Sequence, residues 1–186
     1  MNESASRRRL SRIKLLLVVG VFALPLLAAI VLTATGWRPG TRSHGQAILP
    51  QRSFRGIDIR LANGDAYPWK DSQPRMTLVA LPGSDCLDNC MRLLHLMKNA
   101  RITLNDNADR LRLLYVGEPP HGPKAGKVMR GWQVGTDVDH KLDDFRPRGP
   151  DSVSAILVES DGTALTRYRA GFDPNGLKDD LHKVIR

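Results

Sequence analysis

The fold is decided by one stretch, Met76-Thr-Leu-Val-Ala-Leu-Pro-Gly-Ser-Asp-Cys-Leu-Asp-Asn-Cys-Met-Arg-Leu-Leu-His95. Its first six residues are almost entirely apolar and predict a short buried strand, which a turn containing Pro82 and Gly83 ends. Asp85 is expected to be the N-cap of a helix that opens on Cys86. The stretch therefore predicts a strand, a tight turn and a helix, with cysteine at the helix start.

The two cysteines of the chain, Cys86 and Cys90, both fall within this stretch. Residues four apart share one face of a helix, so the two sulfurs are expected to lie side by side in its first turn. Two adjacent thiols at a helix N-terminus are suited to redox exchange or to binding a soft metal ion. We expect the rest of the chain to position this pair.

An apolar segment near the N-terminus predicts a membrane anchor. Residues 15–34 form a run of twenty residues without a charge, about the length that crosses a hydrocarbon core of roughly 30 Å as a helix. The basic residues ahead of it place the N-terminus in the cytoplasm. A cleaved signal peptide is the alternative, and it is disfavoured by the length of the run. The expected order is a cytoplasmic flank (1–14), a transmembrane anchor (15–36), a linker (37–53) and an extracytoplasmic domain (54–186).

The charge of the chain does not indicate nucleic-acid binding. Residues 1–42 carry seven Lys or Arg and one Glu, so the rest of the chain keeps only +3 of the formal net charge of +9. The basic excess therefore flanks the expected anchor, where it fits a membrane surface. Aromatic residues make up 5% of the chain and are not interleaved with basic ones, so no surface for stacking bases is expected.

Strand-like and helical patterns alternate in the domain that follows. Strands are expected at 54–61, 66–69, 76–81, 111–116, 154–158 and 164–169, a loop at 118–127, a short helix within 132–145, and a helix at 173–185 with Asp173 as its N-cap. The runs at 76–81 and 111–116 are apolar except for Thr77 and Arg112, as in parallel strands buried on both faces. The order β-α-β followed by β-β-α, with cysteines opening the first helix, predicts an α/β, thioredoxin-like fold.

With these features the chain resembles the Sco/SenC family of membrane-anchored, thioredoxin-like proteins that assist copper-site assembly in cytochrome c oxidase. The resemblance rests on the anchor, the linker, the terminal β-hairpin and helix, and above all on the C-x3-C spacing of Cys86 and Cys90. It implies a Sco-like accessory protein in the inner membrane with its domain in the periplasm. The implied partner is an oxidase subunit or another assembly factor, and the implied cofactor is Cu(I).

The chain departs from the family pattern in three places. Leu87 and Met91 follow the cysteines, where the family has prolines. Asp151 occupies the position of the family's copper-binding histidine, and a carboxylate is a poor ligand for Cu(I). Ser154 stands where a thioredoxin places its cis-proline. The resemblance thus implies Cys86 and Cys90 as copper ligands and leaves the third ligand unassigned.

Three interpretations of the cysteine pair follow. In thiol–disulfide exchange, Cys86 would attack and Cys90 would resolve; the helix N-terminus favours the Cys86 thiolate, whereas Asp85 and Asp88 oppose it. In Cu(I) binding, a third donor would come from His140, His121, Met91 or a partner. A static disulfide is the third interpretation, and it is disfavoured because an i, i+4 bridge within a helix would be strained and would close only a short loop.

The expected function is therefore assistance in assembling the oxidase's copper centre, by thiol–disulfide exchange or by weak Cu(I) binding. The sequence leaves open whether the protein is an enzyme; if it is one, the expected class is thiol-disulfide oxidoreductase. The alternative is a non-catalytic, membrane-anchored scaffold that binds an oxidase subunit.

Overall fold

The computed structural model describes residues 14, 17–28, 30–31 and 43–185. The chain divides into two compact units, residues 1–42 and 43–186. In the first unit, residues 17–28 are helical. Among the described residues, no helix is long and apolar enough to cross a membrane. Residues 1–13 of the expected flank and 15–16, 29 and 32–36 of the expected anchor lie outside the described residues.

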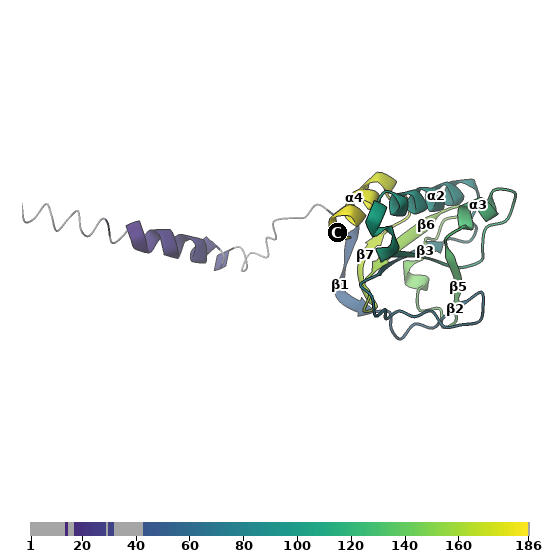
Figure 1. Ribbon diagram of the computed structural model, residues 1–186, viewed down its shortest axis with the longest axis horizontal. Coiled ribbons are helices and arrows are strands. Elements are labelled where there is room, and N and C mark those ends of the chain that lie inside the picture. The colour runs from purple at the N-terminus through teal and green to yellow at the C-terminus, as the bar shows by residue number, and fades with distance from the viewer. Residues whose placement is uncertain (1–13, 15–16, 29, 32–42, 186) are drawn as a thin grey trace, which may run out of the picture. The chain divides into compact units, whose positions relative to one another are not determined.

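The second unit is built on one seven-stranded sheet. Its elements are β1 (Gln46–Ser53), β2 (Ile59–Leu61), β3 (Met76–Pro82), α2 (Asp88–Ile102), the 3-10 helix η1 (Asn105–Arg110), β4 (Leu111–Val116), α3 (Ala125–Met129), β5 (Gln133–Asp137), the 3-10 helix η2 (Asp143–Phe145), β6 (Val153–Val158), β7 (Thr163–Tyr168) and α4 (Pro174–Val184). The strand order is β1-β7-β6-β3-β4-β5-β2. Figure 1 shows α2, α3 and α4 on the same side of this sheet.

Strand β3 lies at the centre of the sheet, parallel to β4 and antiparallel to β6. All of its residues are buried, because its side chains alternate between two hydrophobic clusters. Leu78 and Ala80 join the cluster beneath the helices, and Val79 and Leu81 join the cluster on the opposite face. Burial on both faces explains the mostly apolar run, as predicted.

The face of the sheet away from the helices is covered by loop residues, most of them aromatic. They are Phe54, Tyr67, Trp69, Leu142 and Phe145. The rings make edge-to-face contacts with centroids 5.0 to 5.8 Å apart. The second layer over this face is therefore made of loops and the short 3-10 helix η2 rather than of α-helices.

The structure confirms the strand at Leu111–Val116, the terminal hairpin and the C-terminal helix. The carboxylate of Asp173 caps that helix by accepting the backbone N–H groups of Asn175 and Gly176. Each of these elements has a strong local signal: a mostly apolar run at 111–116, the Asp161-Gly162 turn of the hairpin, and a cap followed by proline at the helix.

Several expectations are wrong. Residues 46–53, expected within the linker, form β1, which pairs with β7; their exposed side chains carry no apolar pattern. The expected helix within 132–145 is β5 followed by η2, and α3 lies partly within the expected loop. The expected 54–61/66–69 hairpin is reduced to one bridge, Arg60 to Ala66, and β2 pairs with β5 instead.

Candidate functional site

The cysteine pair lies just beyond the carboxyl end of β3. After Pro82 the chain passes through residues 83–87 and enters α2 at Asp88. Cys86 therefore precedes the helix, and Cys90 lies in its first turn. The expected helix start at Cys86 is wrong. The expected cap is wrong as well, because Asp85 is exposed and, among the described residues, its carboxylate accepts only the neighbouring Ser84 hydroxyl.

Cys86 and Cys90 are joined by a disulfide whose Cα atoms are 5.1 Å apart. This separation lies inside the usual range for disulfides. The expectation of a strained bridge assumed that both cysteines belong to the helix, which rises about 6 Å over four residues. Because Cys86 lies ahead of the helix, its backbone turns toward Cys90 instead.

The two sulfurs have different environments. Cys90 is fully buried beneath α2 among the core residues of the helical side. Cys86 is half-buried and lines a surface pocket. A reacting group that approaches from solvent therefore meets Cys86 first.

Asp151 caps the N-terminus of α2 from a distant part of the chain. Its Oδ1 accepts the backbone N–H groups of Leu87 at 2.9 Å and Cys90 at 2.8 Å, and its Oδ2 accepts that of Asn89 at 2.9 Å. The Asn89 side-chain amide donates in turn to the Asp151 carbonyl at 3.0 Å. The first N–H groups of a helix have no partner inside it, and here one carboxylate satisfies three backbone donors around the disulfide.

These contacts control the ionisation of Asp151. Burial raises the pKa of its carboxyl group, but the N–H groups of Cys90, Asn89 and Leu87 together outweigh burial and lower the pKa below its usual value. The carboxylate is therefore charged at neutral pH. Its negative charge occupies the position at the helix N-terminus that would otherwise favour a thiolate.

The loop that carries Asp151 is tied to the turn after β3. The Gly83 N–H donates to the Ser152 carbonyl at 2.9 Å. A Cβ atom on Gly83 would lie 2.2 Å from the Gly149 carbonyl oxygen, so only glycine allows this approach. Asp151 has a φ of 45°, a left-handed conformation in which Asp and Asn are more frequent than most residues. The sharp backbone turn directs its carboxylate at the helix.

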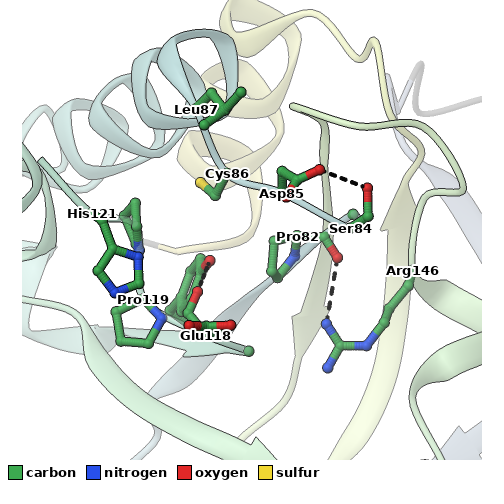
Figure 2. Close-up of a pocket in the computed structure, with 13 residues that line it drawn as sticks. Pro82, Ser84, Asp85, Cys86, Leu87, Glu118, Pro119, His121 and Arg146 are labelled. Atoms are coloured by element: carbon green, nitrogen blue, oxygen red, sulfur yellow. Dashed lines mark hydrogen bonds between the residues drawn. The ribbon is translucent and has the colours of Figure 1, made fainter.

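The pocket beside Cys86 has a volume of about 310 Å³. It is lined by Pro82, Gly83, Ser84, Asp85, Cys86, Leu87, Tyr115, Gly117, Glu118, Pro119, Pro120, His121 and Arg146. Figure 2 shows the Cys86 sulfur directed toward the side of the pocket where His121 and Pro119 lie. The pocket therefore gives access to one sulfur only.

Arg146 connects the ends of two strands at this pocket. Its Nη1 donates to the carbonyls of Val116 at 3.0 Å and Pro82 at 3.4 Å, the second of which Figure 2 draws. The Tyr115 hydroxyl donates to the Glu118 carbonyl at 2.8 Å. Burial raises the pKa of Tyr115 to about 12, Arg146 lowering it less strongly. Tyr115 is therefore a neutral group at the pocket and no base.

Of the side chains considered as a third metal ligand, His121 shares the pocket with Cys86. Met91 packs against the core and lines an adjoining pocket of about 290 Å³ together with Leu87 and His121. His140 is exposed, and its Nδ1 lies 3.3 Å from Asp143. It does not line the pocket at Cys86.

Sequence reasoning found both cysteines and Asp151, but it missed what Asp151 does. It treated the residue as a missing copper ligand, whereas the structure makes it the cap of the cysteine helix. The cap could not be read locally, because 64 residues separate Asp151 from Leu87. One indication of a distant cap was the residue before the helix: position 87 is leucine, not Ser, Thr, Asp or Asn, so no local side chain caps the helix there.

The sequence of residues 76–186 matches the family described as transmembrane-like, thioredoxin-like, C-terminal domain. The chain belongs to this family. The match begins at β3 and includes the cysteine helix and the loop that carries Asp151. No curated protein matches the sequence.

Solved structures with the same fold as this thioredoxin-like family member include three Sco proteins. Arabidopsis thaliana ScoI with copper bound is 14% identical, with a TM-score of 0.51, over 76% of this chain and 98% of that one. Apo Sco1 from Thermus thermophilus is 16% identical, with a TM-score of 0.50, over 78% and 96%. BsSco, a Sco-family cytochrome c oxidase assembly protein in which a disulfide switch was identified, is 16% identical, with a TM-score of 0.50, over 73% and 92%. At these identities the likeness establishes the fold, so the predicted α/β, thioredoxin-like class is confirmed.

Among the described residues, the site of this thioredoxin-like protein shows no preformed three-ligand copper centre. Both Asp151 carboxylate oxygens are engaged by backbone N–H groups, and a carboxylate is a hard ligand that suits Cu(I) poorly. Among the described residues, no group of three or more His, Cys, Asp or Glu is placed to hold a metal ion. The donors present are two sulfurs, which bind copper only after the disulfide is reduced.

Proposed function

We propose that the protein exchanges thiols and disulfides with a partner through Cys86 and Cys90. The observation that carries this proposal is the asymmetry of the pair, in which a half-buried Cys86 at a pocket is bonded to a fully buried Cys90. A disulfide that served stability alone would gain little from a loop this short. Exposure of one sulfur, by contrast, determines which cysteine meets the partner.

When the dithiol protein acts as a reductant, the Cys86 thiolate is the nucleophile. It attacks one sulfur of a partner disulfide, and the other partner sulfur leaves as a thiolate. The Cys90 thiolate then attacks the Cys86 sulfur and releases the partner's remaining thiolate. Two electrons pass to the partner, and the protein is left with the Cys86–Cys90 disulfide.

We infer a membrane-anchored protein with its domain in the periplasm. The uncharged run at 15–34, preceded by five basic residues, supports this orientation. The Sco-like fold and the C-x3-C spacing support a role in assembling the oxidase's copper centre, with an oxidase subunit or another assembly factor as the partner. The partner disulfide would then be one whose thiols must be free to receive copper.

Copper carriage by the protein itself is the second candidate function. Two thiolates suit Cu(I), and His121 lines the pocket at Cys86. This function would require a reduced pair and a third donor from His121 or from the partner. The engagement of Asp151 with backbone N–H groups makes exchange the better supported role.

Single serine variants test the exchange mechanism. The full-length Cys90→Ser protein in detergent should form a mixed disulfide with glutathione disulfide at Cys86, at least about tenfold faster than Cys86→Ser does at Cys90, because burial protects Cys90. Intact-mass spectrometry over time measures both rates. Equal rates would overturn the proposed roles.

A cellular experiment separates exchange from scaffolding. The Cys86→Ser, Cys90→Ser double variant should fail to restore oxidase activity in a strain that lacks the protein. Full restoration by the double variant would overturn both chemical roles and leave the non-catalytic scaffold. Membrane levels of the variant, measured by immunoblot, are the matched control.

A further inference from the structure

The Asp151 carboxylate accepts hydrogen bonds from three residues of the cysteine motif: the residue after Cys86, the residue before Cys90, and Cys90 itself. The donors are the backbone N–H groups of Leu87, Asn89 and Cys90, all between 2.8 and 2.9 Å from the carboxylate. Hydrogen bonds to a charged group are about twice as strong as neutral ones. This side chain therefore fixes the backbone that spans the disulfide.

The Leu87 contact matters most, because it lies outside the helix. Leu87 has a φ of −100° and a ψ of −145°, which is a non-helical conformation. That conformation places Cys86 outside the helix, with its Cα 5.1 Å from that of Cys90. Asp151 therefore holds the segment in the shape that the disulfide requires.

In the dithiol form this shape is not required. With the sulfurs separated, the backbone at residues 85–87 is free to add a turn to α2. The local sequence favours such a turn, because Asp85 is a suitable N-cap for a helix that opens on Cys86. That longer helix would place the Leu87 N–H inside the first turn. A dithiol form with this longer helix would lose the contacts of Asp151 with Leu87 and Cys90 that the disulfide form makes.

We propose that Asp151 is a positioning residue that clamps the Cys86–Leu87 segment in the disulfide geometry and thereby lowers the reduction potential of the pair. A contact that stabilises the oxidised form more than the reduced form makes the protein a stronger reductant. This inference deepens the proposed function and rests on it. The loop of Asp151 is itself held by a hydrogen bond from Gly83, directly after β3, to Ser152, and by one from Asn89 in α2 to the Asp151 carbonyl.

The effect of a nearby negative charge on the cysteine thiolates can be separated from the effect of the Asp151 hydrogen bonds. Carboxylates near a thiol disfavour the thiolate wherever they lie, and Asp85 is adjacent to Cys86 in sequence. Within the described part of the chain, the Asp85 carboxylate accepts the Ser84 hydroxyl and no backbone N–H of the cysteine segment. Asp85→Asn therefore removes a charge without removing the clamp, and is the matched control for Asp151→Asn.

The test is a redox titration of the full-length protein in detergent micelles. The balanced reaction is reduction of the protein disulfide by two glutathione molecules, which yields the dithiol protein and one glutathione disulfide. Samples are quenched in acid, and free thiols are counted by mass-tagged alkylation. Asp151→Asn and Asp151→Gly are the test variants, because both residues tolerate the left-handed φ of 45°.

The equilibrium constant for reduction should rise about tenfold in Asp151→Asn, which corresponds to about 30 mV for a two-electron couple. The rise should be larger in Asp151→Gly, which has no side-chain acceptor. Asp85→Asn should change the constant less than about threefold. Values for both Asp151 variants within twofold of wild type, or an equal rise in Asp85→Asn, would overturn the clamp.

Urea unfolding of the disulfide and dithiol forms tests the role of Asp151 independently of the proposed exchange function. With the disulfide intact, Asp151→Asn should lower the unfolding midpoint, and after reduction with dithiothreitol the decrease should be clearly smaller. Equal decreases would overturn the clamp even if the redox titration succeeds. A wild-type dithiol protein that forms no mixed disulfide with glutathione disulfide would overturn the proposed exchange function, while the unfolding comparison would still decide the role of Asp151.

Discussion

The Asp180 side chain of α4 accepts the backbone N–H of His44 at 2.7 Å, across 136 residues of chain. The same Oδ2 also accepts the hydroxyls of Ser43 and Tyr168, at 3.0 and 3.2 Å. Asp180 is nearly fully buried, and its Oδ1 lies 3.2 Å from Lys183. One carboxylate thus fastens the start of the domain to its last helix.

Asp180→Asn should lower the free energy of unfolding by about 2–4 kcal/mol at pH 7, because it leaves buried donors without a charged acceptor. Chemical denaturation of the full-length protein measures the loss. Asp179→Asn is the matched control, since Asp179 is the exposed neighbour on the same helix, and it should change stability by less than about 0.5 kcal/mol. Equal effects of the two variants would contradict the anchoring role.

The contribution of Asp180 should depend on pH in a defined direction. Burial raises the pKa of Asp180, but hydrogen bonds from Ser43, Gly45, Lys183 and His44 outweigh it and lower the pKa below the usual value. A lowered folded-state pKa gives stability that is fully present above the unfolded pKa of about 4 and is lost as pH falls further. The stability difference between wild type and Asp180→Asn should therefore shrink below about pH 4. A difference that stayed constant down to pH 2 would exclude this linkage.

Gly83→Ala should destabilise the domain by about 1–3 kcal/mol, because its new Cβ would lie 2.2 Å from the Gly149 carbonyl oxygen. Backbone must move to relieve this overlap, and the loop that moves carries Asp151. Urea denaturation measures the loss. The control is Gly126→Ala in α3, where a Cβ meets nothing within 4 Å and alanine favours the helix. A neutral Gly83→Ala would show that the 149–152 loop is not held against the turn.

Leu87→Ser should separate partner recognition from cysteine chemistry. The Leu87 side chain is 59% exposed and lines both pockets beside Cys86, while its backbone N–H bonds to Asp151 independently of the side chain. The variant should keep wild-type stability within about 0.5 kcal/mol and react with glutathione at the wild-type rate. Its rate with the protein partner, followed by mixed-disulfide trapping in the Cys90→Ser background, should fall about fivefold or more. Parallel losses with glutathione would instead place Leu87 in the chemistry of the cysteines.

The sequence predicted the elements that have local signals and missed those that depend on pairing with distant parts of the chain. The buried strands at 76–81 and 111–116 and the capped helix after Asp173 have local signals and were predicted. β1 and β5 are held by backbone pairing to β7 and β4, and their side chains are largely exposed or small. Hydrophobic periodicity therefore could not find them.

The candidate site shows the same limit. The cysteine spacing predicted that the two sulfurs lie side by side, but it could not show that Cys86 lies outside the helix, where the Leu87 N–H bonds to a carboxylate 64 residues away. Local capping rules predicted Asp85 as the N-cap, whereas in the folded chain Asp151 caps the helix. A cap supplied from another element leaves no pattern in the sequence around the helix.

Asp151→His should raise the Cu(I) affinity of the reduced protein about tenfold or more. Imidazole is a better donor to copper than carboxylate, histidine tolerates the left-handed φ of residue 151, and this residue lies against the backbone of both Leu87 and Cys90. Competition with a chromophoric Cu(I) chelator measures the affinity. Asp151→Asn is the matched control, because it also removes the carboxylate and supplies no soft donor. If both variants bound Cu(I) as wild type does, position 151 would be out of reach of the sulfurs, and any third ligand would have to come from elsewhere, with His121 at the pocket the first to replace.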